Sequence, residues 1–355
     1  MPGVFVLSVG RSGSTMVSRM LERHPEICSI SEFWSALYLN SIGNPKMDGG
    51  RFWQLLSEPA GWYSIFMEKA LAADAVPSEI IYDPARGRYT LPECPPLLQM
   101  TLPALSTDPD ALFDWVGREV RDWPRAPVLA HAARLFDLLT AHLERRVWVE
   151  RSGLSYLQVP DLAVGFPEAE YIHLTRDGRD VVLSMMGMRL FDVIVRPTWL
   201  LDALGPGGLK RRLFFKHRNA VRRLTYALFA IDRTLTRQHL RERPYGLPEA
   251  MSEARGVKAY ARFWADATTY GLDAMAALPE GRVRTLRYET LVAEPEARLS
   301  ELIEVILPGG DHAAWIAEAA QMPQFRPSRW AQLDPAIRAE VEDIIAPVNR
   351  RLGYD

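Results

Sequence analysis

The chain has 355 residues, of which 48% are hydrophobic, so it can bury a full core as one large domain or two modest ones, and disorder is not expected. Its net charge of −2 gives no global case for nucleic-acid binding, so any electrostatic argument must be local. The two cysteines, Cys28 and Cys94, provide neither a disulfide framework nor a set of zinc ligands, which fits a reduced compartment.

The N-terminus leaves no room for a secretory signal, because the first predicted strand begins at about Val4. No run of the sequence reaches the roughly 18 apolar residues of a membrane-spanning helix. We therefore predict a soluble, cytoplasmic protein.

The first stretch of the chain predicts a strand, a loop and a helix. Val4 to Leu7 is a short apolar run typical of a buried parallel strand, and residues 8–15 are mostly small or polar. Apolar residues then recur at helical spacing from Met16 until Pro25 ends the pattern. Such a unit forms a cradle for a phosphate-like anion, because loop N–H groups and the positive end of the helix point at the same place.

The loop departs from the signature of nucleoside-triphosphate-binding loops at two positions. Ser8 stands where that signature has its first Gly, and Ser14 stands where it has its Lys. Arg11 supplies a cation from inside the loop instead, and its planar fork can hold two oxygens of a terminal phosphate or sulfate. The alternative is an ordinary strand–turn–helix with an exposed Arg.

The stretch from Ile27 to Leu39 predicts a short strand or turn that leads into a helix, with Ser31 as its cap. Glu32 then lies near the start of that helix, close in sequence to the cradle. Residues 40–127 are broken by Gly, Pro and Trp and indicate an insertion with helices at 51–57, 60–73 and 109–121. Segments of this kind often cap the active face of an α/β sheet.

Charged residues stand at the ends of two further predicted strands. Arg151 lies at the end of strand 146–152, and Arg176 directly follows strand 169–175, with Ser184 eight positions later in a helix. A fourth strand is predicted at 281–289, and further helices are predicted at 128–145, 257–275, 295–306, 312–321 and 335–352. This alternation predicts an α/β fold with a central parallel sheet flanked by helices, whose ligands sit beyond the C-terminal ends of the strands.

A second insertion, about residues 188–256, is predicted to be helical and has a basic middle. Lys and Arg side chains crowd positions 210–223 with no acid among them. The segment indicates either a surface that approaches anionic lipid headgroups or an acidic acceptor, or a solvated helix face that is neutralised elsewhere in the fold. The second interpretation is the more common one for a run of charge.

Two anion sites at neighbouring strand ends predict one ligand with phosphates at both ends of a nucleoside. The cradle takes the 5′ end, and Arg176 and Ser184 take another phosphate. A triphosphate enzyme would also need magnesium, usually held by an acid at the end of an apolar strand, but here Arg151 and Arg176 stand there. Cations in that place suit a transferred group of low charge, such as sulfuryl, which they can stabilise without a metal.

These segments resemble those of the sulfotransferase family. Residues 5–15 are similar to the family's 5′-phosphosulfate loop, and residues 172–184 are similar to its 3′-phosphate motif. Residues 287–291 resemble its Arg-Tyr-Glu-Asp-Leu segment, and residues 328–354 resemble its closing region. The resemblance spans the chain except for the two insertions, and it is closer to tyrosylprotein and bacterial carbohydrate sulfotransferases than to the animal cytosolic subfamily.

The resemblance implies a P-loop-like sulfotransferase fold over a single domain, residues 1–355. It implies 3′-phosphoadenosine 5′-phosphosulfate (PAPS) as the donor, adenosine 3′,5′-bisphosphate as its product, and no metal. The residues that it assigns to the 5′-phosphosulfate are Arg11, Ser12, Gly13, Ser14 and Thr15. Those that it assigns to the 3′-phosphate, the adenine and the closing region are Arg176 and Ser184, Tyr288, and Ser328 with Arg329.

Sulfuryl transfer needs a base for the acceptor proton and cations on the departing phosphate. Glu32 is the candidate base, because it lies where the sulfotransferases that this chain resembles place a catalytic Glu after the loop. Its alternative role is a carboxylate stabilised by the helix dipole. Arg11 and Arg151 would stabilise charge on the bridging oxygen. The other candidate bases are Glu150, His131, His142 and His173, of which His173 lies inside a strand pattern typical of a buried structural residue.

We therefore predict transfer of a sulfuryl group from PAPS to a hydroxyl of a small-molecule, lipid or carbohydrate acceptor. The aromatic and apolar residues of the two insertions slightly favour an apolar alcohol or phenol. Two alternatives remain open. One is a P-loop kinase or nucleotide hydrolase, and the other is a catalytically inactive nucleotide-binding protein that works at a membrane surface through residues 210–223.

Overall fold

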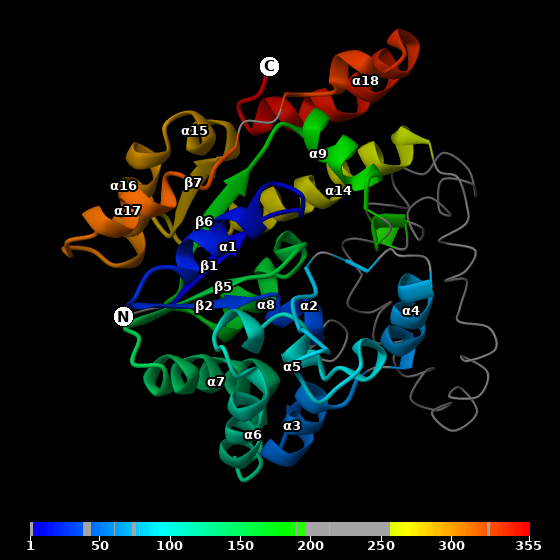
Figure 1. Ribbon diagram of the computed structural model, residues 1–355. Coiled ribbons are helices and arrows are strands. Elements are labelled where there is room, and N and C mark those ends of the chain that lie inside the picture. The colour runs from blue at the N-terminus through cyan, green and yellow to red at the C-terminus, as the bar shows by residue number, and fades with distance from the viewer. Residues whose placement is uncertain are drawn as a thin grey trace. The chain divides into compact units, whose positions relative to one another are not determined.

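The computed structural model in Figure 1 describes residues 3–37, 44–59, 61–72, 76–77, 79–188, 190–192, 194–195, 213, 256–324 and 327–355. The chain divides into two compact units. The first comprises Met1–Ser35, Leu129–Val181 and Ala267–Asp355, and the second comprises Ala36–Val128 and Val182–Asp266. Both stretches predicted as insertions fall within the second unit. That they cap the active face of a single domain stays a prediction.

The first unit is built on a five-stranded sheet with the strand order β2-β5-β1-β6-β7, and each neighbouring pair is parallel. The strands are β1 Val4–Leu7, β2 Ile27–Ser31, β5 Val147–Arg151, β6 Glu170–Thr175 and β7 Val283–Arg287. The predicted α/β class with a central parallel sheet is therefore confirmed. Residues 27–31, for which the sequence left a strand or a turn open, form the strand next to β5.

The α-helices of the described residues are α1 Ser14–Glu22, α2 Phe33–Leu37, α3 Gly49–Ser57, α4 Gly61–Ala72, α5 Pro96–Gln99, α6 Pro109–Val120, α7 Val128–His142, α8 Val159–Gly165, α9 Gly178–Met186, α14 Val257–Met275, α15 Tyr288–Ala293, α16 Pro295–Ile306, α17 Ala313–Ala319 and α18 Pro335–Arg351. Short 3₁₀ turns lie at η1 Leu91–Glu93, η2 Leu102–Ala104, η3 Ser155–Leu157 and η4 Trp330–Gln332. The second unit also holds a two-stranded antiparallel ribbon of β3 Lys46–Met47 and β4 Ala126–Pro127.

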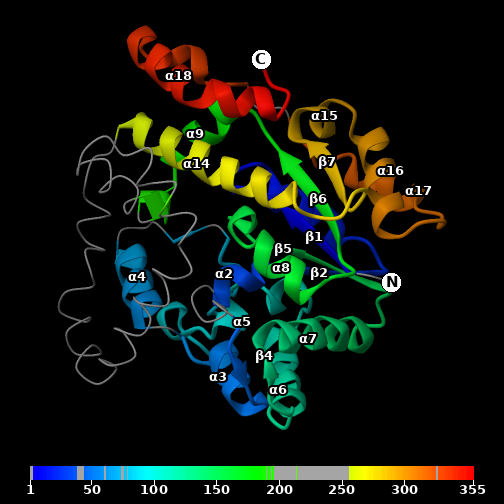
Figure 2. The ribbon, with the colours of Figure 1, turned by 180° about the vertical axis from the view of Figure 1, so that it is seen from behind.

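Successive residues of β1 pack on opposite faces of the sheet. Val4 and Val6 share an apolar core with residues of α1, α16 and α17. Phe5 belongs to the other face, where its ring centroid lies 4.9 Å from that of Phe166. Figures 1 and 2 accordingly show α1 and α8 on opposite sides of the sheet. Because helices cover both faces, the central strands are apolar in succession, as buried parallel strands require.

The predicted cap of α2 is wrong. Ser31 is the last residue of β2, and its hydroxyl accepts a hydrogen bond from the Arg151 guanidinium at 2.6 Å. The N–H of Trp34 in α2 donates instead to the hydroxyl of Ser152, 2.9 Å away. The free backbone N–H at the start of α2 is thus hydrogen-bonded by a residue that follows β5, a contact that the local sequence could not indicate.

The basic stretch at positions 210–223 lies outside the described residues, apart from position 213, so its role stays a prediction. Among the described residues, no helix combines the length and the apolar character that crossing a bilayer needs.

Candidate active site

The loop between β1 and α1 has an unusual backbone. Gly10, Arg11 and Gly13 have φ angles of 83°, 58° and 92°, in the left-handed region that favours glycine. These residues turn the chain from the end of β1 into the first turn of α1, which begins at Ser14 without a side-chain cap on its N-terminal residue. The N–H groups of the loop and the helix start therefore gather at the C-terminal edge of the sheet, as an anion cradle requires.

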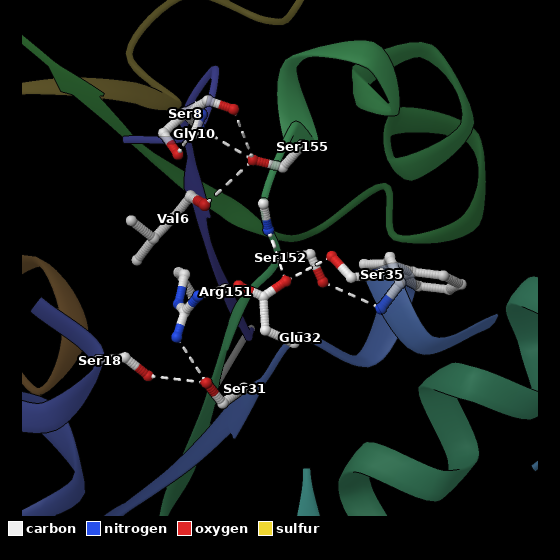
Figure 3. Close-up of polar contacts among 12 residues, drawn as sticks. Val6, Ser8, Gly10, Ser18, Ser31, Glu32, Ser35, Arg151, Ser152 and Ser155 are labelled. Atoms are coloured by element: carbon white, nitrogen blue, oxygen red, sulfur yellow. Dashed lines mark hydrogen bonds and ion pairs between the residues drawn. The ribbon is translucent and has the colours of Figure 1, made fainter. Parts of the chain in front are cut away.

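The base of the cradle is fixed by a residue that the sequence did not single out. Ser155, in η3, accepts a hydrogen bond from the Ser8 N–H at 2.9 Å, and its hydroxyl lies 3.3 Å from the Val6 carbonyl (Figure 3). The Gly10 N–H in turn lies 3.4 Å from the Ser8 hydroxyl. A lone Ser after a strand carries no sequence signal for this role, because only the sheet order brings residue 155 beside residue 8.

Arg176 and Tyr288 lie against the cradle. The Arg176 guanidinium stands 4.4 Å from the centroid of the Tyr288 ring and donates to the backbone carbonyl of Arg11 at 3.3 Å. Tyr288 also approaches Gly13 so closely that a Cβ atom at that glycine would lie 2.4 Å from the ring. The two motifs that were predicted to grip one ligand are thus neighbours in space. Within the described residues, the buried Nε of Arg176 has no hydrogen-bond partner.

The beginning of the closing region, residues 328–354, contacts the start of α9. Ser328 donates from its hydroxyl to a carboxylate oxygen of Asp180 at 2.5 Å, and the other oxygen of Asp180 lies 3.7 Å from the Arg176 guanidinium. Arg329 is exposed and precedes η4. Ser184 lies further along α9 and is half-buried. Ser328 is therefore linked to Arg176 through one shared carboxylate.

Glu32 forms a buried ion pair with Arg151. One carboxylate oxygen accepts from the Arg151 guanidinium, and the other accepts from the Gly153 N–H at 2.8 Å and from the Ser35 hydroxyl (Figure 3). The side chains of Glu32 and Arg151 are only 8% and 4% exposed. Parallel pairing of β2 with β5 aligns Ser31 with Arg151 and so delivers Glu32 to the guanidinium. A buried pair of this kind is costly to break, because either partner alone is an uncompensated charge.

Glu150, the residue before Arg151, is fully buried. It accepts a hydrogen bond from the Ser152 hydroxyl, while its other oxygen has no partner among the described residues. Burial raises the pKa of Glu150 to about 8; the nearby charge of Glu32 also raises it, and the Ser152 hydrogen bond and Arg151 oppose the rise. Burial therefore favours the protonated, uncharged form of the Glu150 carboxyl group.

The histidines considered as bases lie in different surroundings. His173 is buried in β6, with its Nε2 2.5 Å from the Tyr156 hydroxyl, and burial lowers its pKa to about 4. These contacts agree with the structural interpretation of His173. His131 and His142 both lie on α7, the first buried and the second exposed.

A histidine cluster at the opposite end of the sheet is held by hydrogen bonds. Ligand atoms of His24, Glu26 and His312 lie within 4.8 Å of one another. The Glu26 N–H donates to Nδ1 of His24 at 3.1 Å, which leaves the His24 proton on Nε2, 3.0 Å from Nδ1 of His312. Nε2 of His312 then donates to the Leu307 carbonyl at 2.9 Å. If Nε2 of His24 bound a metal, the ring proton would have to sit on Nδ1, where it would face the Glu26 N–H that now donates to that atom. We therefore assign the cluster a structural role.

Comparisons with known proteins find sulfotransferases. The model of the sulfotransferase family matches residues 2–74. The matched stretch holds β1, the cradle, α1, β2 and Glu32, and it confirms the resemblance to sulfotransferases that the sequence motifs indicated.

Sulfotransferases are also among the solved structures that resemble this chain. The sulfotransferase domain from the curacin biosynthetic pathway is 17% identical, with a TM-score of 0.44 and coverage of 100% of this chain and 99% of that one. The sulfotransferase domain from the Synechococcus PCC 7002 olefin synthase is 16% identical, with a TM-score of 0.46 and coverage of 100% and 95%. Sulfotransferase STF9 from Mycobacterium avium is 14% identical, with a TM-score of 0.43 and coverage of 100% and 78%. No curated protein matches the chain.

Proposed function

We propose that this protein is a sulfotransferase that moves a sulfuryl group from PAPS to a hydroxyl of a small-molecule, lipid or carbohydrate acceptor. The observation that carries the proposal is the meeting of the Arg11 loop with Arg176 and Tyr288. A cradle at one strand end and a guanidinium at the next, bridged by a tyrosine ring, supply an anion site, a cation and an aromatic surface side by side. These are the groups that a nucleotide with two separated phosphates needs.

The proposed donor contacts are those that the sequence motifs imply. In the proposal, Arg11, Ser12, Gly13, Ser14 and Thr15 hold the 5′-phosphosulfate. Arg176 and Ser184 hold the 3′-phosphate, with Ser328 and Arg329 closing over it, and Tyr288 lies along the adenosine. One feature supports a bound ligand here: the buried Nε of Arg176 has no hydrogen-bond partner in the described part of the chain. Gly13, which has no side chain, lets the Tyr288 ring pack directly against the loop.

Glu32 and Arg151 act together in the proposed reaction. The Glu32 oxygen bound by Ser35 and Gly153 faces away from the guanidinium contact, so it is the oxygen that can exchange a partner for the acceptor hydroxyl. Arg151 is committed to Glu32 and Ser31, which supports a positioning role for it. The Arg11 guanidinium then stabilises the negative charge that develops on the bridging oxygen.

The experiment that tests the function is an assay with radiolabelled PAPS and extracts of the source cell, with the labelled product identified by mass. A sulfated product and tight binding of adenosine 3′,5′-bisphosphate without magnesium are expected. Magnesium-dependent turnover of ATP in place of sulfate transfer would contradict the proposal.

A further inference from the structure

The turn between β6 and α9 is held by side chains from two distant segments. The N–H of Gly178 donates to Oδ1 of Asn349 in α18 at 2.9 Å, and the N–H of Asp177 donates to a carboxylate oxygen of Glu289 in α15 at 3.0 Å. Asn349 is almost completely buried and donates from Nδ2 to Asp177 at 3.0 Å. Protein side chains therefore occupy both N–H groups that follow Arg176, so a ligand at this turn must be bound by side chains such as the Arg176 guanidinium.

Tyr354 ties the C-terminus to the same turn. Its hydroxyl donates to the second carboxylate oxygen of Glu289 at 2.7 Å and lies 3.2 Å from the hydroxyl of Thr175. Its ring lies under the Arg287 guanidinium, 4.2 Å from the centroid. The left-handed backbone of Gly353, with φ of 77°, directs Tyr354 back so that its N–H reaches the Asn349 carbonyl at 2.9 Å. Glu289 thus bridges Tyr354 and Asp177.

We infer that Asn349 and Tyr354 form, with Glu289, a C-terminal clasp that positions Arg176 for donor binding. The inference rests on the proposed function. Arg176 lies between Thr175 and Asp177 in the chain. Thr175 is hydrogen-bonded to Tyr354, and Asp177 is hydrogen-bonded to Asn349, so the clasp holds the residue on each side of Arg176. A guanidinium that must reach both Tyr288 and the Arg11 carbonyl tolerates little movement of the backbone beneath it, since hydrogen bonds weaken steeply with distance and angle. The clasp touches no reacting atom, so its members are positioning residues.

The test uses two clasp variants of the full chain and one matched control. Tyr354→Phe removes the hydroxyl and keeps the ring under Arg287, Asn349→Leu removes both side-chain hydrogen bonds, and Tyr171→Phe makes the same chemical change in β6 at the other end of the sheet. In the clasp variants, affinity for adenosine 3′,5′-bisphosphate should fall about 5- to 30-fold and the donor KM should rise in parallel, while kcat stays within about twofold. Hydrogen exchange of residues 175–180 should be faster. The control should match the wild type in all four measurements.

The possible results distinguish failure of the clasp inference from failure of the proposed sulfotransferase function. Unchanged affinity and unchanged exchange in Tyr354→Phe, which keeps the packing, would overturn the clasp even if Asn349→Leu fails to fold. A loss of thermal stability with affinity and KM unchanged would show a purely structural contact and would also overturn it. If the wild type itself binds no adenosine 3′,5′-bisphosphate, the proposed function fails, and the donor role of the clasp fails with it.

Discussion

Glu32 combines a strained backbone with a fully bonded side chain. Its φ of 56° is rare for a residue with a side chain, and such a conformation costs on the order of 1–3 kcal/mol. The ion pair with Arg151 and the N–H bond from Gly153 hold it in place. These contacts fix the orientation of the carboxylate, which is what the proposed general base needs.

Replacing Glu32 with an amide tests whether its carboxylate is the general base. Glu32→Gln should bind adenosine 3′,5′-bisphosphate normally and lose about 10²- to 10⁴-fold in turnover, because the amide accepts no proton from the acceptor. Steady-state assays with PAPS and the identified acceptor give turnover, and calorimetry gives binding.

The matched control is Glu150→Gln, the same change one residue from Arg151. Since burial favours the protonated form of Glu150, the uncharged amide of Gln is a close mimic of it, and turnover should stay within about threefold of the wild type. Near-normal turnover in Glu32→Gln would instead point to another base.

Arg176 is the residue whose loss should weaken donor binding most directly. Arg176→Ala should reduce the affinity for adenosine 3′,5′-bisphosphate by about 1.5–3 kcal/mol, since a charged hydrogen bond is lost. Calorimetry without magnesium measures this, and Arg284→Ala, an exposed arginine on β7, is the control that should bind normally. Equal affinity in the Arg176 variant and the wild type would remove the second anion site from the proposal.

At the scale of the elements, the cradle depends on a glycine at the junction of the loop with α1. Gly13 has φ of 92°, and an added Cβ would meet the Tyr288 ring at 2.4 Å; Gly309 has a similar φ of 75°, with nothing within 4 Å of its added Cβ. A side chain at either position would therefore strain the left-handed backbone. Only at position 13 would it also clash with a neighbouring ring.

This pair of glycines separates strain from close approach. Gly309→Ala should lower the free energy of unfolding by about 1 kcal/mol and leave nucleotide binding unchanged. Gly13→Ala should lower it further and abolish binding of adenosine 3′,5′-bisphosphate, because Tyr288 must move off the loop. Urea unfolding and calorimetry give the two quantities. Equal effects of the two substitutions would mean that the contact of Tyr288 with the cradle does not matter.

At the scale of the whole molecule, buried histidines should make the fold sensitive to acid. Burial lowers the pKa of His24 and brings that of His173 to about 4, whereas a histidine in the unfolded chain titrates at about 6.5. The unfolded state therefore binds more protons between these values, and the free energy of unfolding should fall as the pH drops from about 6.5 toward 4. Above that window the contribution is fully present.

Comparing variants isolates this contribution from other titrating groups. Between pH 7 and pH 4.5, His173→Gln should lose less stability than the wild type, as measured by urea unfolding at each pH. Parallel curves for the two proteins would show that His173 is not held neutral in the fold.

The sequence alone determined the local elements and the chemical character of their ends. The apolar run at 4–7, the small residues of the cradle and the arginines at the ends of β5 and β6 are all visible in neighbouring positions, because helix and strand periodicity and turn composition are short-range properties. They were enough to predict a parallel α/β sheet and an anion site at its C-terminal edge. Residues 27–31 stayed ambiguous because a short apolar run fits either a strand or a turn.

Only the tertiary structure decided which of these residues meet. The strand order sets Ser155 beneath Ser8 and Glu32 against Arg151, and the packing of the last residues places Tyr354 against Thr175 at the end of β6. These contacts span more than a hundred positions in the chain. It also moved Ser31 from a helix cap to a partner of Arg151. No local pattern encodes such contacts, because they depend on how the crossovers and the register of the sheet bring separate strand ends together.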